Sequence, residues 1–176
     1  MTALTLDPSR SELRVRTGAE GLLGALAHSL ELVGDALQGT LDGERATVTL
    51  ATDALRVDGA VRHGAVDPAV LSPQDRAEIT RRLRQEVFAG GGALTLTLRR
   101  EAGALRGELR TPRGAQAVTV RATERQEASG ARVFQGALTA SLRALGVPAL
   151  RGPLGAFRVA DALQARFTAV FVPPGG

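Results

Sequence analysis

The sequence predicts a mainly β protein: a closed antiparallel β-barrel of about eight strands with one amphipathic helix and a short helix near the N-terminus. Three observations predict this class. Most segments alternate apolar and polar residues, the pattern of strands with one buried and one solvated face. The segments follow one another through short turns, which favours an antiparallel meander. Closure removes the exposed edges that so many amphipathic strands would otherwise leave.

Length and composition describe one ordinary globular domain over residues 1–176. Hydrophobic residues make up 44% and charged residues 23%, and no apolar run approaches the roughly 20 residues of a transmembrane segment. The chain has no cysteine, which excludes thiolate chemistry and cysteine metal sites. The N-terminal MTALTLDPSR lacks the basic start and apolar core of a signal peptide, so we expect a cytoplasmic protein.

The charge pattern argues against a nucleic-acid partner. The net charge is only +4, and the pI of about 11.2 is high because the chain has no lysine, tyrosine or cysteine to titrate. Arginines are interspersed with acids, and the aromatic residues, 3% of the chain, are all phenylalanine. Nucleic-acid-binding surfaces usually combine a basic stripe with stacking aromatic residues. We therefore expect no nucleic acid to bind.

The first half of the chain predicts four strands and a short helix. Alternation predicts strands at 12–16, 28–32, 37–42 and 46–50. The dipeptide Asp42-Gly43 is typical of a tight hairpin turn. Three leucines within 19–27 have the spacing of one helical face, which predicts the short helix there. Residues 53–71 show no regular period and predict an irregular connection.

One longer helix is predicted at about 73–88. Ser72 suits the N-cap, Pro73 the first helical position and Asp75 the first turn. An apolar stripe recurs at every fourth residue, at Ile79, Leu83 and Val87. Arginines occupy the other sides, and three glycines at 90–92 end the helix. An amphipathic helix can adsorb to a membrane, but this narrow stripe favours a helix that packs on the sheet.

The second half returns to a period of two. Strands are predicted at 94–98, 105–109, 118–122, 132–143 and 159–172. A Gly/Pro-rich connection joins the last two strands. The predicted inner face carries small residues at Gly39, Gly107, Gly136, Ala140, Ala165 and Ala169. Either the glycines mark bends in coiled strands, or the small residues leave an apolar cavity that a bulky residue at Gly136 or Ala165 would block.

Five segments in this order resemble the YceI-like domains, which are lipocalin-like barrels associated with polyisoprenoid binding. They are SELRVRTGAEGLLGALAHSLEL, LSPQDRAEITRRLRQEV, LRTPRGAQAVTV, FQGALTASLRALGV and VADALQARFTAVFV. The second segment is similar to the helix region of one bacterial branch of the family. The sequence departs from the family at Ser29, where Asp is commoner, at AGGGALTLTL after the helix, and in lacking a secretory leader. The resemblance implies a lipocalin-like barrel that binds an apolar, isoprenoid-like ligand.

The candidate site is the barrel interior. The expected ligand-contacting residues are Leu22, Leu26, His28, Leu30, Leu96, Phe134, Leu138, Phe167 and Phe171. Pockets pair apolar walls with a few fixed polar groups, and the candidate anchors for a head group are His28, Gln116 and Asp161. For His28 a hydrogen-bonded structural role is the alternative. Two distant histidines without a suitable carboxylate spacing predict no metal site, and we expect no catalytic residue or obligatory cofactor.

Three functions remain open at this point. The first is non-catalytic sequestration of an isoprenoid-like lipid or quinone inside the barrel. The second is a filled barrel that acts as a scaffold, with the arginine-rich helix as its contact surface and a homodimer as one expected assembly. The third is a small-molecule enzyme that uses His28, which the sequence supports least because no acid or base is placed beside this histidine.

Overall fold

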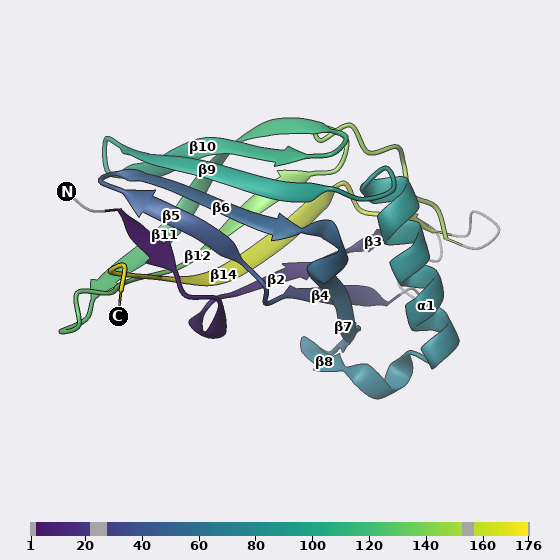
Figure 1. Cartoon of the computed structure of the whole chain (residues 1–176). Helices are drawn as coiled ribbons and strands as arrows, with labels where there is room; N and C mark the ends of the chain where they lie inside the picture. Colours follow the sequence, from purple (N-terminus) through teal and green to yellow (C-terminus); the bar gives the residue numbers. More distant parts are fainter. Residues whose placement is uncertain (1–2, 22–27, 153–156, 176) are drawn as a thin grey trace.

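The computed structural model describes residues 3–21, 28–152 and 157–175 (Figure 1). The first seven strands are β1 Leu4–Leu6, β2 Glu12–Arg16, β3 Ala19–Glu20, β4 Ser29–Gly34, β5 Gln38–Asp42, β6 Arg45–Ala51 and β7 Leu55–Arg62. The remaining strands are β8 Ala65–Asp67, β9 Ala93–Glu101, β10 Ala104–Thr111, β11 Gly114–Gln126, β12 Arg132–Ser141, β13 Arg158–Val159 and β14 Ala162–Val172. The helical elements are α1 Pro73–Arg82 with its π-helical continuation η5 Leu83–Val87, and the single turns η1 Pro8–Arg10, η3 Thr52–Ala54 and η4 Pro68–Val70.

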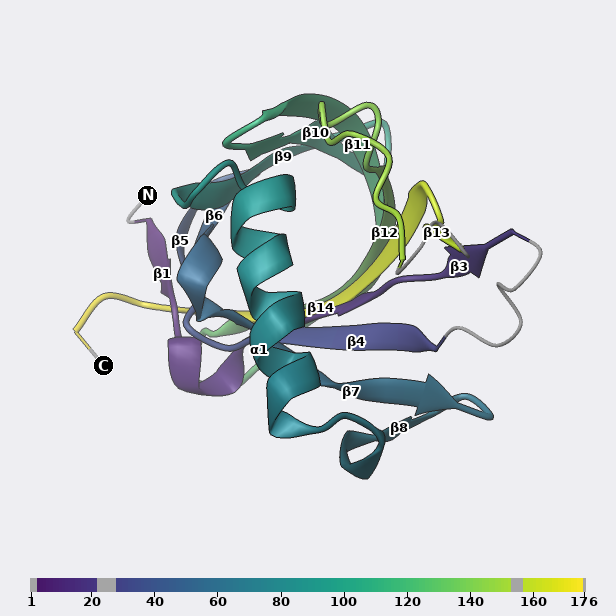
Figure 2. The same ribbon diagram turned by 90° about the vertical axis from the view of Figure 1, so that its right-hand side faces the viewer.

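Eight antiparallel strands close the barrel, which confirms the predicted fold class (Figure 2). Around the ring the order is β1, β5, β6, β9, β10, β11, β12 and β14, and β14 pairs back with β1. Because the first and last strands of the ring are hydrogen-bonded, the ring has no free edge. The sheet also continues from β14 through β2, β4, β7 and β8.

The closing strand β1 was not predicted, because three residues are too short to show a period. It and β2 lie along the same edge of β14, separated by η1. At this break the amide of Asp7 donates to the carbonyl of Val170 (2.8 Å), and the Ser11 hydroxyl accepts from the amide of Val170 (3.0 Å). Ser11 is buried, so its side chain satisfies a backbone amide that has lost its strand partner.

The prediction of an irregular segment at 53–71 is wrong, because this stretch contains β7 and β8. A register shift between Glu31 and Leu32 of β4 pairs these residues with Gly59 and Val57 of β7, which leaves Asp58 as an extra residue. Such a bulge shifts the inward-facing set by one position and so hides the alternation in the sequence. The β7–β8 turn places His63 on the surface at a φ of 49°.

Large and small side chains face each other across β12 and β14, where the alternation was clearest. In this register Phe134 lies opposite Ala169, and the inward-facing Phe167 lies opposite Gly136. Leu138 likewise lies opposite Ala165. This pairing lets neighbouring side chains interdigitate on the inner face. The rings of Phe134 and Phe171 meet edge to face, with centroids 5.9 Å apart, near one end of the core.

The helix predicted at 73–88 is confirmed as α1 and η5, and it lies across one end of the barrel (Figure 2). Ser72 accepts a hydrogen bond from the amide of Asp75, whose carboxylate accepts from the amide of Ser72, so both form a capping box. The apolar stripe at Ile79, Leu83 and Val87 packs against the core. The helix is therefore a cover for the barrel end, positioned by its apolar face.

The short helix predicted at 19–27 is not seen where the structure describes this stretch. Ala19 and Glu20 form β3, which pairs with β13 through Val159 and Arg158. With only two residues, β3 is too short to show a period in the sequence, and its partner β13 lies far away along the chain. Residues 22–27, which carry the three leucines, lie outside the described residues.

Candidate functional site

A cavity of about 650 Å³ occupies the barrel interior. Its walls come from the inward-facing residues of the barrel strands and from α1 and η5. Leucine predominates: the wall includes Leu13, Leu30, Leu32, Leu50, Leu94, Leu96, Leu98, Leu105 and Leu109. The volume falls within the range of small-molecule sites, and an eight-stranded barrel is wide enough to hold one small ligand.

The two explanations for the small inner residues apply to different residues. Ala140, Ala165 and Ala169 line the cavity and widen it. At Gly107 and Gly136 the neighbouring strand comes too close for any side chain, because an added Cβ would collide with the carbonyl of Thr97 or Arg121. A bulky residue at Gly136 would therefore separate the strands, whereas one at Ala165 would enter the cavity.

An ion-pair network lies at the cavity end furthest from α1. Glu124 bridges Arg100 and Arg132, with 2.7 Å between Glu124 Oε1 and Arg132 Nε, and Arg100 also pairs with Glu44 at 3.1 Å. Arg132 donates to the carbonyl of Gly43 and lies 5.4 Å from the centroid of the Phe134 ring. Because acids and bases balance here, this end of the cavity is polar without excess charge.

The other end lies under α1 and beside Leu150, Phe157 and Val159, which line the cavity and are partly exposed to solvent, and we call this end the mouth. Glu78, Arg82 and Glu86 of the helix line it together with Thr17 and His28. Arg82 forms a bidentate ion pair with Glu86, with hydrogen bonds of 2.7 and 3.0 Å, and also donates to the carbonyl of Arg151 (2.8 Å). The hydrogen bonds from Arg82 lower the pKa of Glu86. The cavity is thus apolar along its length, with charged groups confined to its two ends.

Comparison with known proteins shows the fold. Neither a protein-family model nor a curated protein matches the sequence. The crystal structure of BcnA from Burkholderia cenocepacia matches at a TM-score of 0.61 and 16% identity, over 94% of this chain and 98% of that one. A polyisoprenoid-binding domain from Saccharophagus degradans, implicated in plant cell wall breakdown, matches at a TM-score of 0.68 and 11% identity, over 99% and 100%.

The chain has the YceI-like fold. Both similar structures span nearly the whole chain, so the resemblance in the sequence is confirmed at the level of the fold. At 11% and 16% identity, the similarity to these two structures shows a shared fold and no shared function.

Most of the predicted wall residues meet in the cavity of the YceI-like barrel. The predicted residues that line it are His28, Leu30, Leu96, Phe134, Leu138, Phe167 and Phe171. Leu22 and Leu26 lie outside the described residues. Sequence reasoning did not single out Leu150, Phe157 or Val159, which also line the cavity. Leu150 lies within the Gly/Pro-rich connection and Phe157 just after it, so no alternating pattern marked these two, while Val159 is the first residue of the strand predicted at 159–172.

Gln116 and Asp161, the other candidate anchors, have structural partners in this YceI-like barrel. The Gln116 side-chain oxygen accepts a hydrogen bond from the amide of Ser141 (2.9 Å). Asp161 accepts from the Ser141 hydroxyl (2.6 Å) and the Arg143 amide (2.8 Å), and these bonds lower its pKa. Neither is among the residues that line the cavity. The sequence alternation assigned both residues to the inner face. In the structure they instead stabilise the turn at the end of β12.

His28 immediately precedes β4 at the cavity mouth, and its side chain is exposed. Its position differs from the expected one within the strand. Among the described residues it makes no hydrogen bond to a carboxylate or hydroxyl that could form a catalytic pair, and no three His, Cys, Asp or Glu side chains gather as metal ligands would. No helix in the described part of the chain could span a membrane.

Proposed function

We propose that the protein binds one apolar molecule, an isoprenoid-like lipid or a long-chain quinone, inside the barrel and holds it without chemical change. The observation that carries this proposal is the cavity of about 650 Å³, whose middle is lined by leucine, phenylalanine and alanine. Transfer of an apolar chain from water to such walls is favourable by about 25 cal/mol per Å² of buried surface. A hydrocarbon chain fits these walls, whereas a polar ligand would lose its hydrogen bonds.

The positions of the polar groups support a ligand with a polar head. His28, Arg82 and Glu86 lie at the mouth and the ion pairs around Arg132 and Glu44 at the far end, while the described walls between them carry no charged side chain. Pockets of this kind orient a ligand through a few polar groups at one end. The description of the Saccharophagus degradans domain as polyisoprenoid-binding supports the same class of ligand for this chain.

The cavity argues against the scaffold alternative, because the barrel interior is not filled. The enzyme alternative has little support, since His28 is exposed and lies at the mouth rather than within a buried pair. Binding without catalysis therefore fits the site best.

Native mass spectrometry of the purified protein, followed by organic extraction, tests the proposal. We expect a stoichiometric adduct that dissociates as an apolar molecule. Protein refolded from urea without lipid should take up a long-chain quinone. Ala165→Phe should abolish uptake, because the new ring would occupy the cavity between Leu138 and Val15.

Gln164→Phe is the matched control, since Gln164 is the exposed neighbour of Ala165 on β14. It adds the same ring outside the barrel and should leave uptake unchanged. Equal quinone uptake by the wild type and the Ala165→Phe variant, with both folded by circular dichroism, would show that the ligand binds elsewhere.

A further inference from the structure

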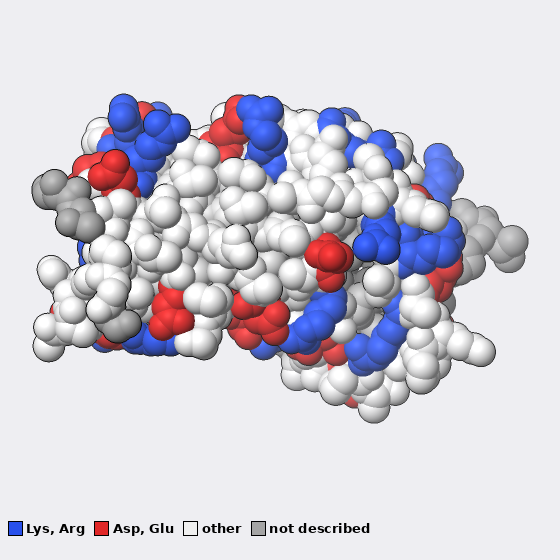
Figure 3. Space-filling view, in the orientation of Figure 1, with Lys and Arg blue, Asp and Glu red and all other residues white. Residues whose placement is uncertain are grey.

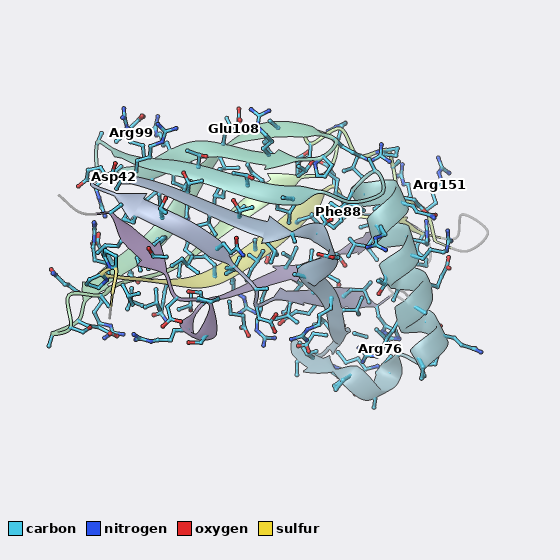
Figure 4. The ribbon with its side chains drawn as sticks, viewed as in Figure 1. Asp42, Arg76, Phe88, Arg99, Glu108 and Arg151 are labelled. Atoms are coloured by element: carbon cyan, nitrogen blue, oxygen red, sulfur yellow. The ribbon has the colours of Figure 1, made fainter. Side chains whose placement is uncertain are left out.

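Five arginines at the cavity mouth have no ion-pair partner among the described residues. These rim arginines are Arg84, Arg113, Arg143, Arg151 and Arg158, and each is exposed. Figure 3 shows arginine side chains at the end of the molecule that carries α1, and Figure 4 places Arg151 there. At the far end of the cavity, the lining arginines Arg100 and Arg132 are paired with Glu44 and Glu124. The described arginines without ion pairs at that end, such as Arg99, lie on the outer face of the barrel.

The rim arginines belong to segments that are joined side by side around the mouth. Arg113 in the β10–β11 turn donates to the carbonyl of Gln85 in η5 (3.1 Å), which places it beside Arg84. The same turn packs against Leu145 and Gly146, just after Arg143. Arg151 pairs with Arg158 in an isolated bridge, and its carbonyl accepts a hydrogen bond from Arg82 of α1 (2.8 Å). The unpaired charges thus form one continuous crescent.

Apolar side chains lie next to this crescent and contact both the cavity and the solvent. Leu150, Phe157 and Val159 line the cavity and are also partly exposed to solvent. They alternate in sequence with Arg151 and Arg158, so guanidinium groups flank an apolar path that leads into the cavity. A bilayer surface offers anionic head groups above an apolar layer, and this rim matches both features.

We propose that the mouth end of the barrel docks on an anionic lipid bilayer, with the rim arginines at the head groups and Leu150, Phe157 and Val159 facing the lipid. Docking in this orientation opens the cavity directly onto the membrane, so a lipid could enter without crossing water. The docking depends only on the rim, whereas its use for loading rests on the proposed function.

A bilayer fits the rim better than a nucleic acid does. Surfaces that bind single-stranded nucleic acids stack bases on aromatic rings, and Phe157 is the one aromatic residue in the described part of this rim. An apolar path beside the charges has no partner in the phosphate backbone of a duplex. Lipid head groups and chains satisfy the charges and the apolar side chains together.

Flotation with vesicles of phosphatidylcholine, with and without phosphatidylglycerol, tests the docking. We expect binding to the mixed vesicles, no binding to phosphatidylcholine alone, and weaker binding as salt rises. The triple variant R84Q/R113Q/R151Q should lose roughly 100-fold in affinity for the mixed vesicles, at about 1 kcal/mol for each arginine near an anionic surface.

The matched control is R45Q/R99Q/R106Q. These three arginines lie directly opposite one another on the outer face of β6, β9 and β10, and Arg99 lies at the end away from α1 (Figure 4). Each triple variant removes three positive charges from a net charge of +4, so only position differs. The control should keep its affinity for mixed vesicles.

An equal loss of vesicle affinity in both triple variants would overturn the proposal, as would binding to duplex DNA at the affinity measured for mixed vesicles. Absence of any vesicle binding by the wild type would overturn it as well. Ala165→Phe separates this proposal from the proposed function, because it should lose quinone uptake and still float with mixed vesicles. If the wild type floats but takes up no quinone, the docking stands and the proposed function fails.

Discussion

Glu31 is a buried carboxylate on the outer face of the sheet, with 2% of the residue exposed. It accepts hydrogen bonds from Arg16 (2.6 and 3.0 Å) and Arg14 (3.1 Å), and Arg166 lies 3.7 Å away. Arg14 also pairs with Glu12 and Asp58, so the network is nearly balanced in charge. Burial raises the pKa of Glu31, but the hydrogen bonds from Arg16 and Arg14 outweigh it, and the pKa is lowered overall.

Replacing Glu31 by Gln should lower the free energy of unfolding by about 2 kcal/mol, because the arginines lose a charged acceptor and the buried amide cannot replace it. Urea unfolding at neutral pH measures this change. Glu12→Gln is the control: its carboxylate also pairs with Arg14 but is largely exposed, so its loss should cost less than about 0.5 kcal/mol. Equal costs for the two variants would contradict the role of burial.

The same carboxylate predicts a pH dependence. A carboxyl group whose folded pKa is lowered stabilises the protein above its unfolded value of about 4.3, and this contribution is lost as pH falls through the folded pKa. The difference in stability between the wild type and Glu31→Gln should therefore be full at neutral pH and shrink below about pH 4. Urea unfolding from pH 7 downward checks this, and a difference that stays constant would contradict it.

Arg76 fastens α1 to the sheet, which the sequence did not indicate. Its guanidinium donates to the carbonyls of Val57 (3.0 Å), Asp58 (3.2 Å) and Pro68 (2.6 Å), and Figure 4 shows it at the lower end of the helix beside β7. In the sequence, Arg76 cannot be told apart from the solvent-exposed arginines of the same helix. Its role follows from the bulged strand β7, whose carbonyls it satisfies.

Arg76→Gln should loosen α1 without unfolding the barrel. We expect hydrogen exchange of the α1 amides to become about tenfold faster, because the helix loses charge-assisted bonds to three carbonyls. Arg81→Gln is the control, since among the described residues Arg81 bonds only within the helix, to Glu78 and Gln85. Unchanged exchange in Arg76→Gln would show that the apolar stripe alone holds the helix in place.

The whole barrel should be less stable without its ligand. A ligand present at about 100 times its Kd adds about 2.7 kcal/mol, so protein refolded from urea without lipid should melt roughly 5–10 °C lower than the protein as purified. Adding a long-chain quinone should restore the Tm of the wild type and leave the Ala165→Phe variant unchanged. Identical Tm values for purified, refolded and quinone-treated wild-type protein would contradict a ligand inside the barrel.

The sequence determined the parts of this protein that repeat with a regular local period. Alternation along 132–143 and 159–172 predicted the two facing strands, and the stripe at Ile79, Leu83 and Val87 predicted the helix. The same inner parity predicted most of the cavity wall, because side chains two residues apart on a strand necessarily share a face.

Only the tertiary structure decided the rest. A three-residue strand, β1, closes the barrel, and the bulge opposite Glu31 hides β7, because neither has enough regular residues to show a period. Gln116 and Asp161 have inner parity yet hold the turn after β12, since strand ends leave backbone amides that need acceptors. The rim arginines are scattered over the sequence from Arg84 to Arg158, and the folding of four separate segments brings them to one mouth.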